Sequence, residues 1–170
     1  MSETLEPALP DHLEEQAERL MHRLCEAGLT VATAESCTGG MLAALLTDIE
    51  GAGHGFDRGF VVYTKQSKTD LLGIVGDVLD RNDAVSEIVA RGMAEGALQR
   101  SAADIAVGVT GFAGPAAPGD EEGLVHFALA RRGHPTTHRV EHFGAAGRGP
   151  VRVKSLKAML EMLERAIEQE

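Results

Sequence analysis

The sequence has few aromatic residues: its 170 residues include no Trp, one Tyr and five Phe. The core must therefore consist mainly of aliphatic side chains, which a hydrophobic content of 44% can supply. Long apolar runs are also missing, since none approaches the ~20 residues that a membrane-spanning helix needs. We therefore expect one globular domain and no membrane partner.

Cysteine is scarce as well, because Cys25 and Cys37 are the only two and cannot make a disulfide scaffold. Neither they nor the seven histidines show the spacing of a metal site. The net charge of −10 disfavours general binding to nucleic-acid backbones. The acidic start, MSETLEPALPDHLEE, lacks the basic and apolar stretches of a signal peptide, so we expect a cytoplasmic protein.

Hydrophobic spacing and turn residues divide the chain into a flexible tail, residues 1–10, and one domain, residues 11–170. Asp11 and Glu14 resemble a capping box at the start of a helix that Gly28 ends. Further helices are predicted at 41–46, 68–72, 77–79, 87–101 and 151–167. Strands are predicted at 30–33, 59–63, 104–110, 124–130 and 137–143. The strands at 59–63 and 104–110 are expected to be buried.

The order of these elements is helix, then β-α-β-α, then β-β-β-α. It predicts an α/β fold, a three-layer α/β/α sandwich with a mixed, mostly parallel sheet of about five strands. Gly92 and Gly96 lie one turn apart on the helix at 87–101, which indicates close packing against another backbone. That backbone can belong to the core or to a second copy of the chain. We expect a homo-oligomer and favour a dimer.

Residues 30–47, TVATAESCTGGMLAALLT, are typical of a strand, a tight glycine turn and a helix. We expect this corner to leave backbone N–H groups bare at a helix N-terminus, where they hold an anion or an oxyanion. It also presents Ser36, Cys37 and Thr38 as candidate nucleophiles. The alternative is that the two glycines only permit a tight turn against the sheet.

Polar loops follow three predicted strands, at 36–40, 63–68 and 110–115, and the glycine-rich segment 144–152 is a candidate fourth. In open α/β sheets, ligands bind at the carboxyl ends of the strands. The sequence therefore predicts a functional site where these loops meet.

Motifs along the chain resemble one family. They are AESCTGG, GFVVYT-x-x-x-K-x-x-LLGI, AVSE-x-V-A-x-x-M-x-x-GAL, DIAVGVTG-x-AGP and G-R-x-x-V-R. Together they resemble the C-terminal domain of the competence/damage-inducible protein A (CinA-like) family, from about residue 12 to the end. The resemblance implies hydrolysis of nicotinamide mononucleotide to nicotinic acid mononucleotide and ammonia, a step of pyridine-nucleotide salvage. Larger members carry an additional molybdopterin-binding-like domain, so the chain resembles the stand-alone form.

Amide hydrolysis needs a nucleophile, a base, an acid for the departing ammonia and an oxyanion site. Ser36 is the candidate nucleophile and Lys68 the candidate base, as in Ser–Lys enzymes. Tyr63 is a candidate for relaying a proton or orienting Lys68. The alternatives are that Lys68 is a solvated lysine at a helix start, Tyr63 a core residue and Cys37 a small buried side chain. This scheme requires no metal or organic cofactor.

Candidate substrate-binding residues come from both glycine turns: Cys37, Thr38, Gly39, Gly40, Thr110, Gly111 and Gly114. The backbone N–H groups from Thr38 to Gly40 are the candidate oxyanion donors. Arg148 matches the family's late arginine and is the candidate phosphate ligand, because its planar fork fits phosphate oxygens. Its alternative is a solvated charge in a flexible loop, residues 144–150.

Three departures from the family pattern are expected near the substrate. Lys65 stands where the family usually has Asn, residues 116–122 are shorter and more acidic, and Ala146 replaces an acid. Lys65 is also expected to lower the pKa of Lys68 by repulsion. These changes keep open a second hypothesis, a catalytically degenerate nucleotide-binding or scaffold domain linked to competence or the DNA-damage response.

Overall fold

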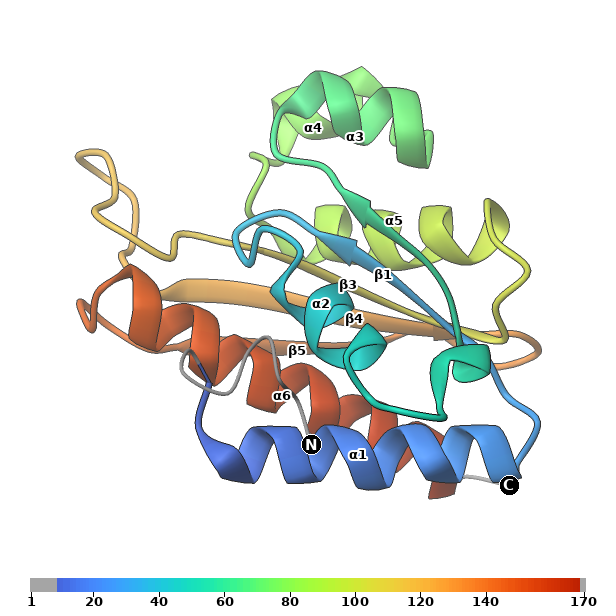
Figure 1. The fold of residues 1–170 in the computed structure, drawn as a ribbon. Coiled ribbons are helices and arrows are strands. Elements are labelled where there is room, and N and C mark those ends of the chain that lie inside the picture. Colours follow the sequence, from blue (N-terminus) through green and yellow to red (C-terminus); the bar gives the residue numbers. More distant parts are fainter. Residues whose placement is uncertain (1–8, 169–170) are drawn as a thin grey trace.

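A computed structural model describes residues 9–168 and contains one five-stranded sheet with helices on both faces (Figure 1). The strands are β1 (Val31–Glu35), β2 (Phe56–Val61), β3 (Ile105–Gly111), β4 (Leu124–Arg131) and β5 (Thr137–His142). Their order across the sheet is β2-β1-β3-β4-β5. Both pairings of β1 are parallel and both pairings of β4 are antiparallel, so only β4 runs against the others. The predicted mixed, mostly parallel sheet is confirmed.

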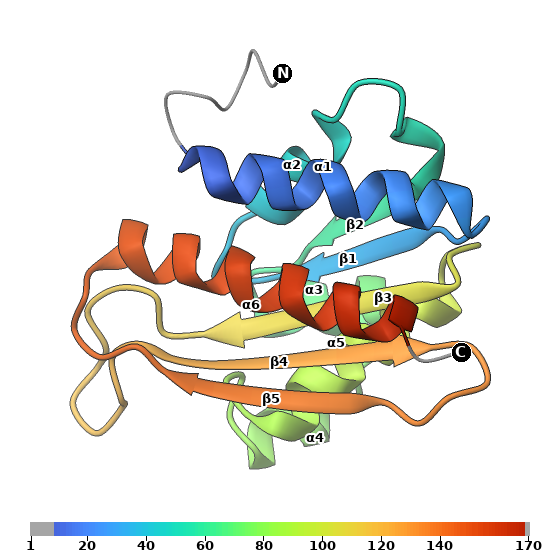
Figure 2. The same ribbon diagram turned by 90° about the horizontal axis from the view of Figure 1, so that it is seen from below.

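The helices form the two outer layers of the sandwich. They are α1 (Asp11–Glu26), α2 (Met41–Thr47), α3 (Lys65–Leu72), α4 (Gly76–Arg81), α5 (Glu87–Gln99) and α6 (Arg148–Glu168), with a short 3-10 turn, η1 (Gly53–Gly55). Helices α1, α2 and α6 cover one face, and α3, α4 and α5 cover the other (Figures 1 and 2). None of the helices between residues 9 and 168 has the length and hydrophobicity that crossing a membrane requires.

Strand β1 at the centre of the sheet directs alternate side chains into the two layers, because successive residues of a strand face opposite sides. Val31 belongs to the larger core under α1, α2 and α6. Ala32 and Ala34 belong to the core under α3, α4 and α5. By the same alternation, Glu35 faces α2 and Ser36, just past the strand, faces α3.

The N-terminal helix confirms its predicted buried face but not its predicted start. Its buried positions include all four expected residues, Leu13, Ala17, Leu20 and Leu24. Pro10, rather than Asp11, occupies the N-cap position, and no side chain caps the helix, so the predicted capping box is wrong. Of the expected tail, residues 1–10, the first eight lie outside the described part of the chain. Leu9 is buried in the core.

Several other boundaries differ from the prediction, and three of them bear on the site. The strand expected at 59–63 runs from Phe56 to Val61 at the sheet edge, and its residues are half-buried or exposed rather than buried. The helix expected at 68–72 begins at Lys65, within the expected polar loop at 63–68, and Thr64 and Ser67 form a capping box there. Helix α6 begins at Arg148 instead of Val151, so this arginine is not part of a loop.

Candidate active site

The predicted loops meet at one open cavity of about 260 Å³ beyond the carboxyl ends of β1 and β3. Its lining includes eight predicted site residues: Ser36, Cys37, Tyr63, Lys68, Thr110, Gly111, Gly114 and Arg148. Ala84 and Val85, which belong to the AVSE motif but were not among the candidate site residues, also line it. The turn residues Thr38, Gly39 and Gly40 lie next to this cavity in the chain but are not part of its lining.

Lys68 is the most unusual residue of the site, because its side chain is only 1% exposed. Its Nζ lies 3.0 Å from the Ser36 Oγ. It also donates to the backbone carbonyl oxygens of Val62, at 2.9 Å, and Tyr63, at 3.2 Å. The alternative of a solvated lysine at a helix start is therefore wrong.

Burial lowers the pKa of Lys68 from 10.5 to about 8, while Cys37 acts weakly in the opposite direction. About a tenth of the molecules then carry a neutral amine at pH 7, against far fewer for an exposed lysine. A neutral amine has two N–H donors and one lone pair. The two carbonyls accept both donors, so the lone pair is directed at the third neighbour, the Ser36 hydroxyl. This is the arrangement that a base needs to take a serine proton.

Ser36 follows β1 and begins a tight turn. Its N–H donates to the carbonyl of Val109 on β3, and its carbonyl accepts from the Gly39 N–H. Gly39 and Gly40 have φ angles of +63° and +94°, which side-chain-bearing residues adopt at a cost. The turn therefore requires glycine, as expected, and it leaves the Ser36 hydroxyl at the edge of the cavity.

Glu35 is a site residue that the sequence analysis missed. Its fully buried carboxylate accepts hydrogen bonds from the N–H groups of Leu42 and Ala43 and from the Thr38 hydroxyl. Glu35 thus occupies two N–H groups in the first turn of α2, so those of Leu42 and Ala43 are not bare as expected. An acidic residue at the end of an apolar strand, directly before the turn, was the available signal.

Cys37 has the properties of a structural residue. It is buried, and burial raises the pKa of its thiol from 9.0 to about 12. A thiol with such a pKa holds almost no thiolate near neutrality, and the thiolate is the nucleophilic form. Of the two adjacent candidate nucleophiles, the electrostatics favour Ser36.

Tyr63 lies at the cavity beside Lys68. Its side chain is 67% exposed, so it is not a core residue. Its backbone carbonyl, and not its phenol, accepts the hydrogen bond from Lys68. The phenol lines the cavity mouth, where it can contact a bound molecule.

The second glycine turn contributes Thr110, Gly111 and Gly114 to the lining of the same cavity. The Thr110 hydroxyl donates to the carbonyl of Ala84 at 2.7 Å, which holds the α4–α5 connection against β3. Gly111 is required by the close approach of β4, because a Cβ there would lie 2.7 Å from the Leu124 carbonyl oxygen. A Cβ on Gly114 would lie 2.6 Å from the Arg148 guanidinium. Arg148 therefore reaches across this loop from the first turn of α6.

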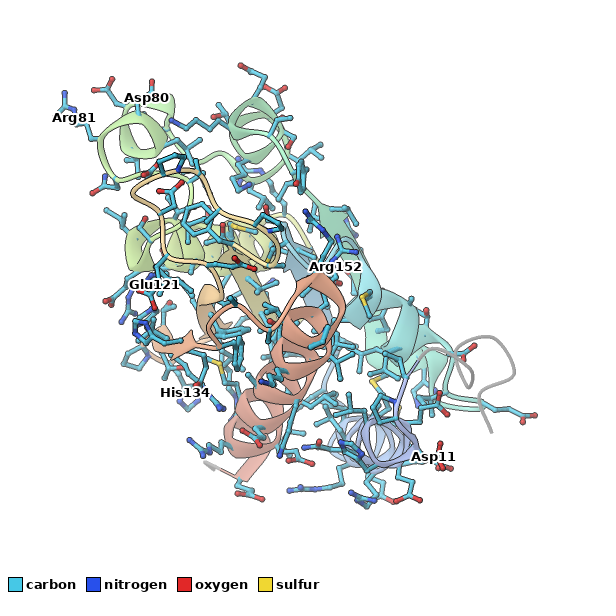
Figure 3. All side chains as sticks on the ribbon, turned by 90° about the vertical axis from the view of Figure 1, so that its left-hand side faces the viewer. Asp11, Asp80, Arg81, Glu121, His134 and Arg152 are labelled. Carbon is cyan, nitrogen blue, oxygen red and sulfur yellow. The ribbon has the colours of Figure 1, made fainter. Side chains whose placement is uncertain are left out.

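The three departures from the family pattern are not among the residues that line this cavity. Lys65 pairs with Asp80 of α4 at 3.1 Å, on the outer side of the molecule where Figure 3 shows Asp80. It is not among the causes of the lowered pKa of Lys68. Residues 116–122 and Ala146 are also absent from the described lining.

Within the described part of the chain, no three His, Cys, Asp or Glu side chains are grouped so that they could hold a metal ion. The side chains that line the cavity offer a hydroxyl, an amine and an arginine, beside the backbone amides of its loops. These are the groups of covalent acyl transfer with a lysine base.

Comparison with known proteins gives one consistent answer. The CinA C-terminal domain family matches residues 13–167. A CinA-like protein of Mycolicibacterium vanbaalenii is 43% identical over 83% of this chain and 34% of its own length. The crystal structure of competence/damage inducible protein CihA from Agrobacterium tumefaciens has a TM-score of 0.90 and 43% identity, covering 95% of this chain and 98% of that one.

A CinA superfamily protein from Escherichia coli has a TM-score of 0.85 and 36% identity, covering 91% of this chain and 90% of that one. The chain spans about a quarter to a third of the length of the curated relatives that it matches. It spans almost the whole of the CihA crystal structure.

Proposed function

Because the chain belongs to the family of CinA C-terminal domains, we propose that it is an amidohydrolase that converts nicotinamide mononucleotide and water to nicotinic acid mononucleotide and ammonia. The observation that carries this proposal is the buried Lys68 amine, 3.0 Å from the Ser36 hydroxyl. A lysine so placed has a cost for the fold, since burial disfavours its charged form. Activation of a serine nucleophile explains why that cost is tolerated.

In the proposed first step, neutral Lys68 takes the Ser36 proton while Oγ attacks the carboxamide carbon. The carbonyl oxygen becomes an oxyanion, which backbone N–H groups of the 36–40 turn stabilise. Protonated Lys68 then gives its proton to the amide nitrogen, and the C–N bond breaks to release ammonia. The acyl group of the substrate remains bonded to the Ser36 Oγ as an ester.

In the second step, water takes the place of Ser36 as the nucleophile. Neutral Lys68 accepts a proton from water, the hydroxyl attacks the ester carbon, and the proton returns to the Ser36 oxygen as the ester bond breaks. The product acid leaves and the site is restored. Tyr63 at the cavity mouth is proposed to contact the pyridine ring, and Arg148 to bind the phosphate.

The alternative function, a degenerate nucleotide-binding or scaffold domain, rested on Lys65 and on residues 116–122. Both lie outside the cavity lining. They therefore give that alternative no support at the site, and we propose only the amidohydrolase function.

The test is ammonia release from nicotinamide mononucleotide by the purified protein. We expect turnover by the wild type. In Ser36→Ala we expect the rate of ammonia release to fall by several orders of magnitude, because the cavity then holds no activated hydroxyl to attack the amide. Free nicotinamide is the matched control substrate, since it carries the same amide without ribose and phosphate. The absence of ammonia release by the wild type from the nucleotide would overturn the proposal.

A further inference from the structure

Phe112 is a half-buried aromatic residue that lies outside the hydrophobic cores. The chain has five phenylalanines, and all of them belong to the described residues. Phe127 is buried in the larger core, and Phe56 and Phe143 pack against it. Phe60 packs against the core under α3, α4 and α5. Phe112 belongs to none of the hydrophobic clusters within residues 9–168 and lines the cavity instead. A ring so placed is available to a bound molecule.

The backbone on both sides of Phe112 is held in place by β4. The N–H of Phe112 donates to the carbonyl oxygen of Leu124 at 2.9 Å, and its carbonyl accepts from the Gly123 N–H at 2.8 Å. The preceding residue, Gly111, is so close to β4 that a Cβ there would lie 2.7 Å from the same Leu124 oxygen. Because the sheet fixes this backbone, the Phe112 side chain can hold a ligand ring at a small cost in conformational entropy.

Phe112 also lies between the two groups that are proposed to bind the ends of the substrate. The Ser36 N–H donates to the carbonyl of Val109, near the carboxyl end of β3. The guanidinium of Arg148 lies at the far side of the following loop, where a Cβ on Gly114 would be 2.6 Å from it. In nicotinamide mononucleotide the pyridine ring likewise lies between the amide and the phosphate. An amide at Ser36 and a phosphate at Arg148 therefore bring the ring to the part of the loop that carries Phe112.

The charge of this ring gives Phe112 a specific task. The ring nitrogen is bonded to the ribose, which makes the ring a pyridinium cation. The charged side chains among the described residues of the lining are Lys68 and Arg148, and none is Asp or Glu. An aromatic face attracts a cation, and more strongly where water is excluded. Of the two aromatic residues of the lining, Tyr63 is 67% exposed at the cavity mouth, whereas Phe112 is half-buried. We propose that Phe112 binds the pyridinium ring of the substrate through a cation–π contact and selects the cationic ring over a neutral one.

This inference rests on the proposed function for the identity of its ligand, so its test measures binding rather than turnover. Calorimetry compares nicotinamide mononucleotide with its reduced dihydropyridine form, which carries the same amide, ribose and phosphate on an uncharged ring. Both are titrated into Ser36→Ala, in which the substrate is expected to stay intact. In this background, Phe112→Leu should weaken binding of the cationic nucleotide about 3- to 30-fold and change binding of the neutral form by less than about twofold. Phe112→Tyr keeps an aromatic face and should retain the preference for the cation.

Phe56→Leu is the matched control, because it makes the same change at the start of β2, outside the cavity lining, and should alter neither affinity. Equal weakening of both ligands by Phe112→Leu, or no weakening, would overturn the inference, and ammonia release by the wild type would still support the reaction. A preference for the cation that depends on Phe112, in a protein that releases no ammonia, would sustain the inference and reject the reaction. If neither ligand binds, the inference is overturned, and the ammonia assay decides separately on the reaction.

Discussion

Glu35 and Ser36 are adjacent in the sequence, yet their side chains serve opposite layers of the sandwich. The Glu35 carboxylate is fully buried and accepts from two N–H groups of α2, while the Ser36 hydroxyl meets Lys68 of α3. Because successive side chains of β1 point to opposite faces, Glu35 can bind the start of α2 while the next residue, Ser36, points to the opposite face.

Replacing Glu35 should destabilise the protein rather than change its chemistry directly. Glu35→Ala leaves the N–H groups of Leu42 and Ala43, the first of them buried, and the Thr38 hydroxyl without their acceptor. We expect a loss on the order of 3 kcal/mol in the free energy of unfolding, measured by urea denaturation. Glu35→Gln keeps one acceptor oxygen and should lose clearly less. Equal stability of Glu35→Ala and the wild type would contradict the role of Glu35 as the anchor of this turn.

The rate of ammonia release should rise with pH through an apparent pKa near 8, because the neutral form of Lys68 is the proposed base. Lys68→Met should abolish this ascending limb together with most of the rate. Lys65→Asn, which restores the family residue, is the control and should leave the limb in place, because Lys65 is paired with Asp80 outside the cavity. A limb that moves upward by a full unit in Lys65→Asn would show that Lys65 sets the pKa of Lys68.

The stability of the fold should also depend on Lys68, whether or not the protein is an enzyme. Its pKa is about 8 when folded and 10.5 as the ordinary value, so the unfolded chain binds more protons between these values. Stability therefore rises with pH above about 8, by up to ~1.4 kcal/mol per pH unit. Cys37, with a pKa raised from 9.0 to about 12, acts in the opposite sense above pH 9.

The wild type and Lys68→Met are compared in urea between about pH 7 and about pH 9, and Cys37 cancels in their difference. We expect the wild type to gain stability relative to the variant over this range. A constant difference would mean that Lys68 keeps an ordinary pKa in the folded protein.

Arg148 should bind the phosphate of the substrate. Arg148→Ala is expected to weaken binding of nicotinamide mononucleotide by about 1.5–3 kcal/mol, the range of hydrogen bonds to charged groups. Nicotinamide riboside, which lacks the phosphate, should bind both proteins equally in calorimetry. Arg148→Lys should fall between them, because it keeps the charge and loses the fork. Equal losses for nucleotide and riboside would remove Arg148 from phosphate binding.

Much of the fold could be predicted because the signals were local. The apolar spacing of α1, the run of β3 and the glycine turn after β1 each depend on neighbouring residues. The sequence also pointed to the Ser36–Lys68 pair through the family motifs, and the structure brings these two side chains together. Their chemical roles stay predictions.

The rest of the site depends on contacts that are distant in the chain. Lys65 could not be placed outside the cavity before its partner Asp80 on α4 was known. Arg152 bonds to a carbonyl 115 positions earlier, and a carbonyl acceptor leaves no mark on residue identity. The composition of β2 is typical of a buried strand. Its position at the edge of the sheet follows from the strand order and could not be read from its residues.

The central claim is that Ser36 forms a covalent ester with the substrate, and rapid acid quenching followed by mass spectrometry tests it most directly. The wild type mixed with nicotinamide mononucleotide should carry the mass of the nicotinic acid mononucleotide acyl group on the peptide that contains Ser36. Cys37→Ala should carry the same mass, and Ser36→Ala should carry none. An adduct that disappears in Cys37→Ala, or ammonia released in the first turnover without any covalent adduct, would contradict the account.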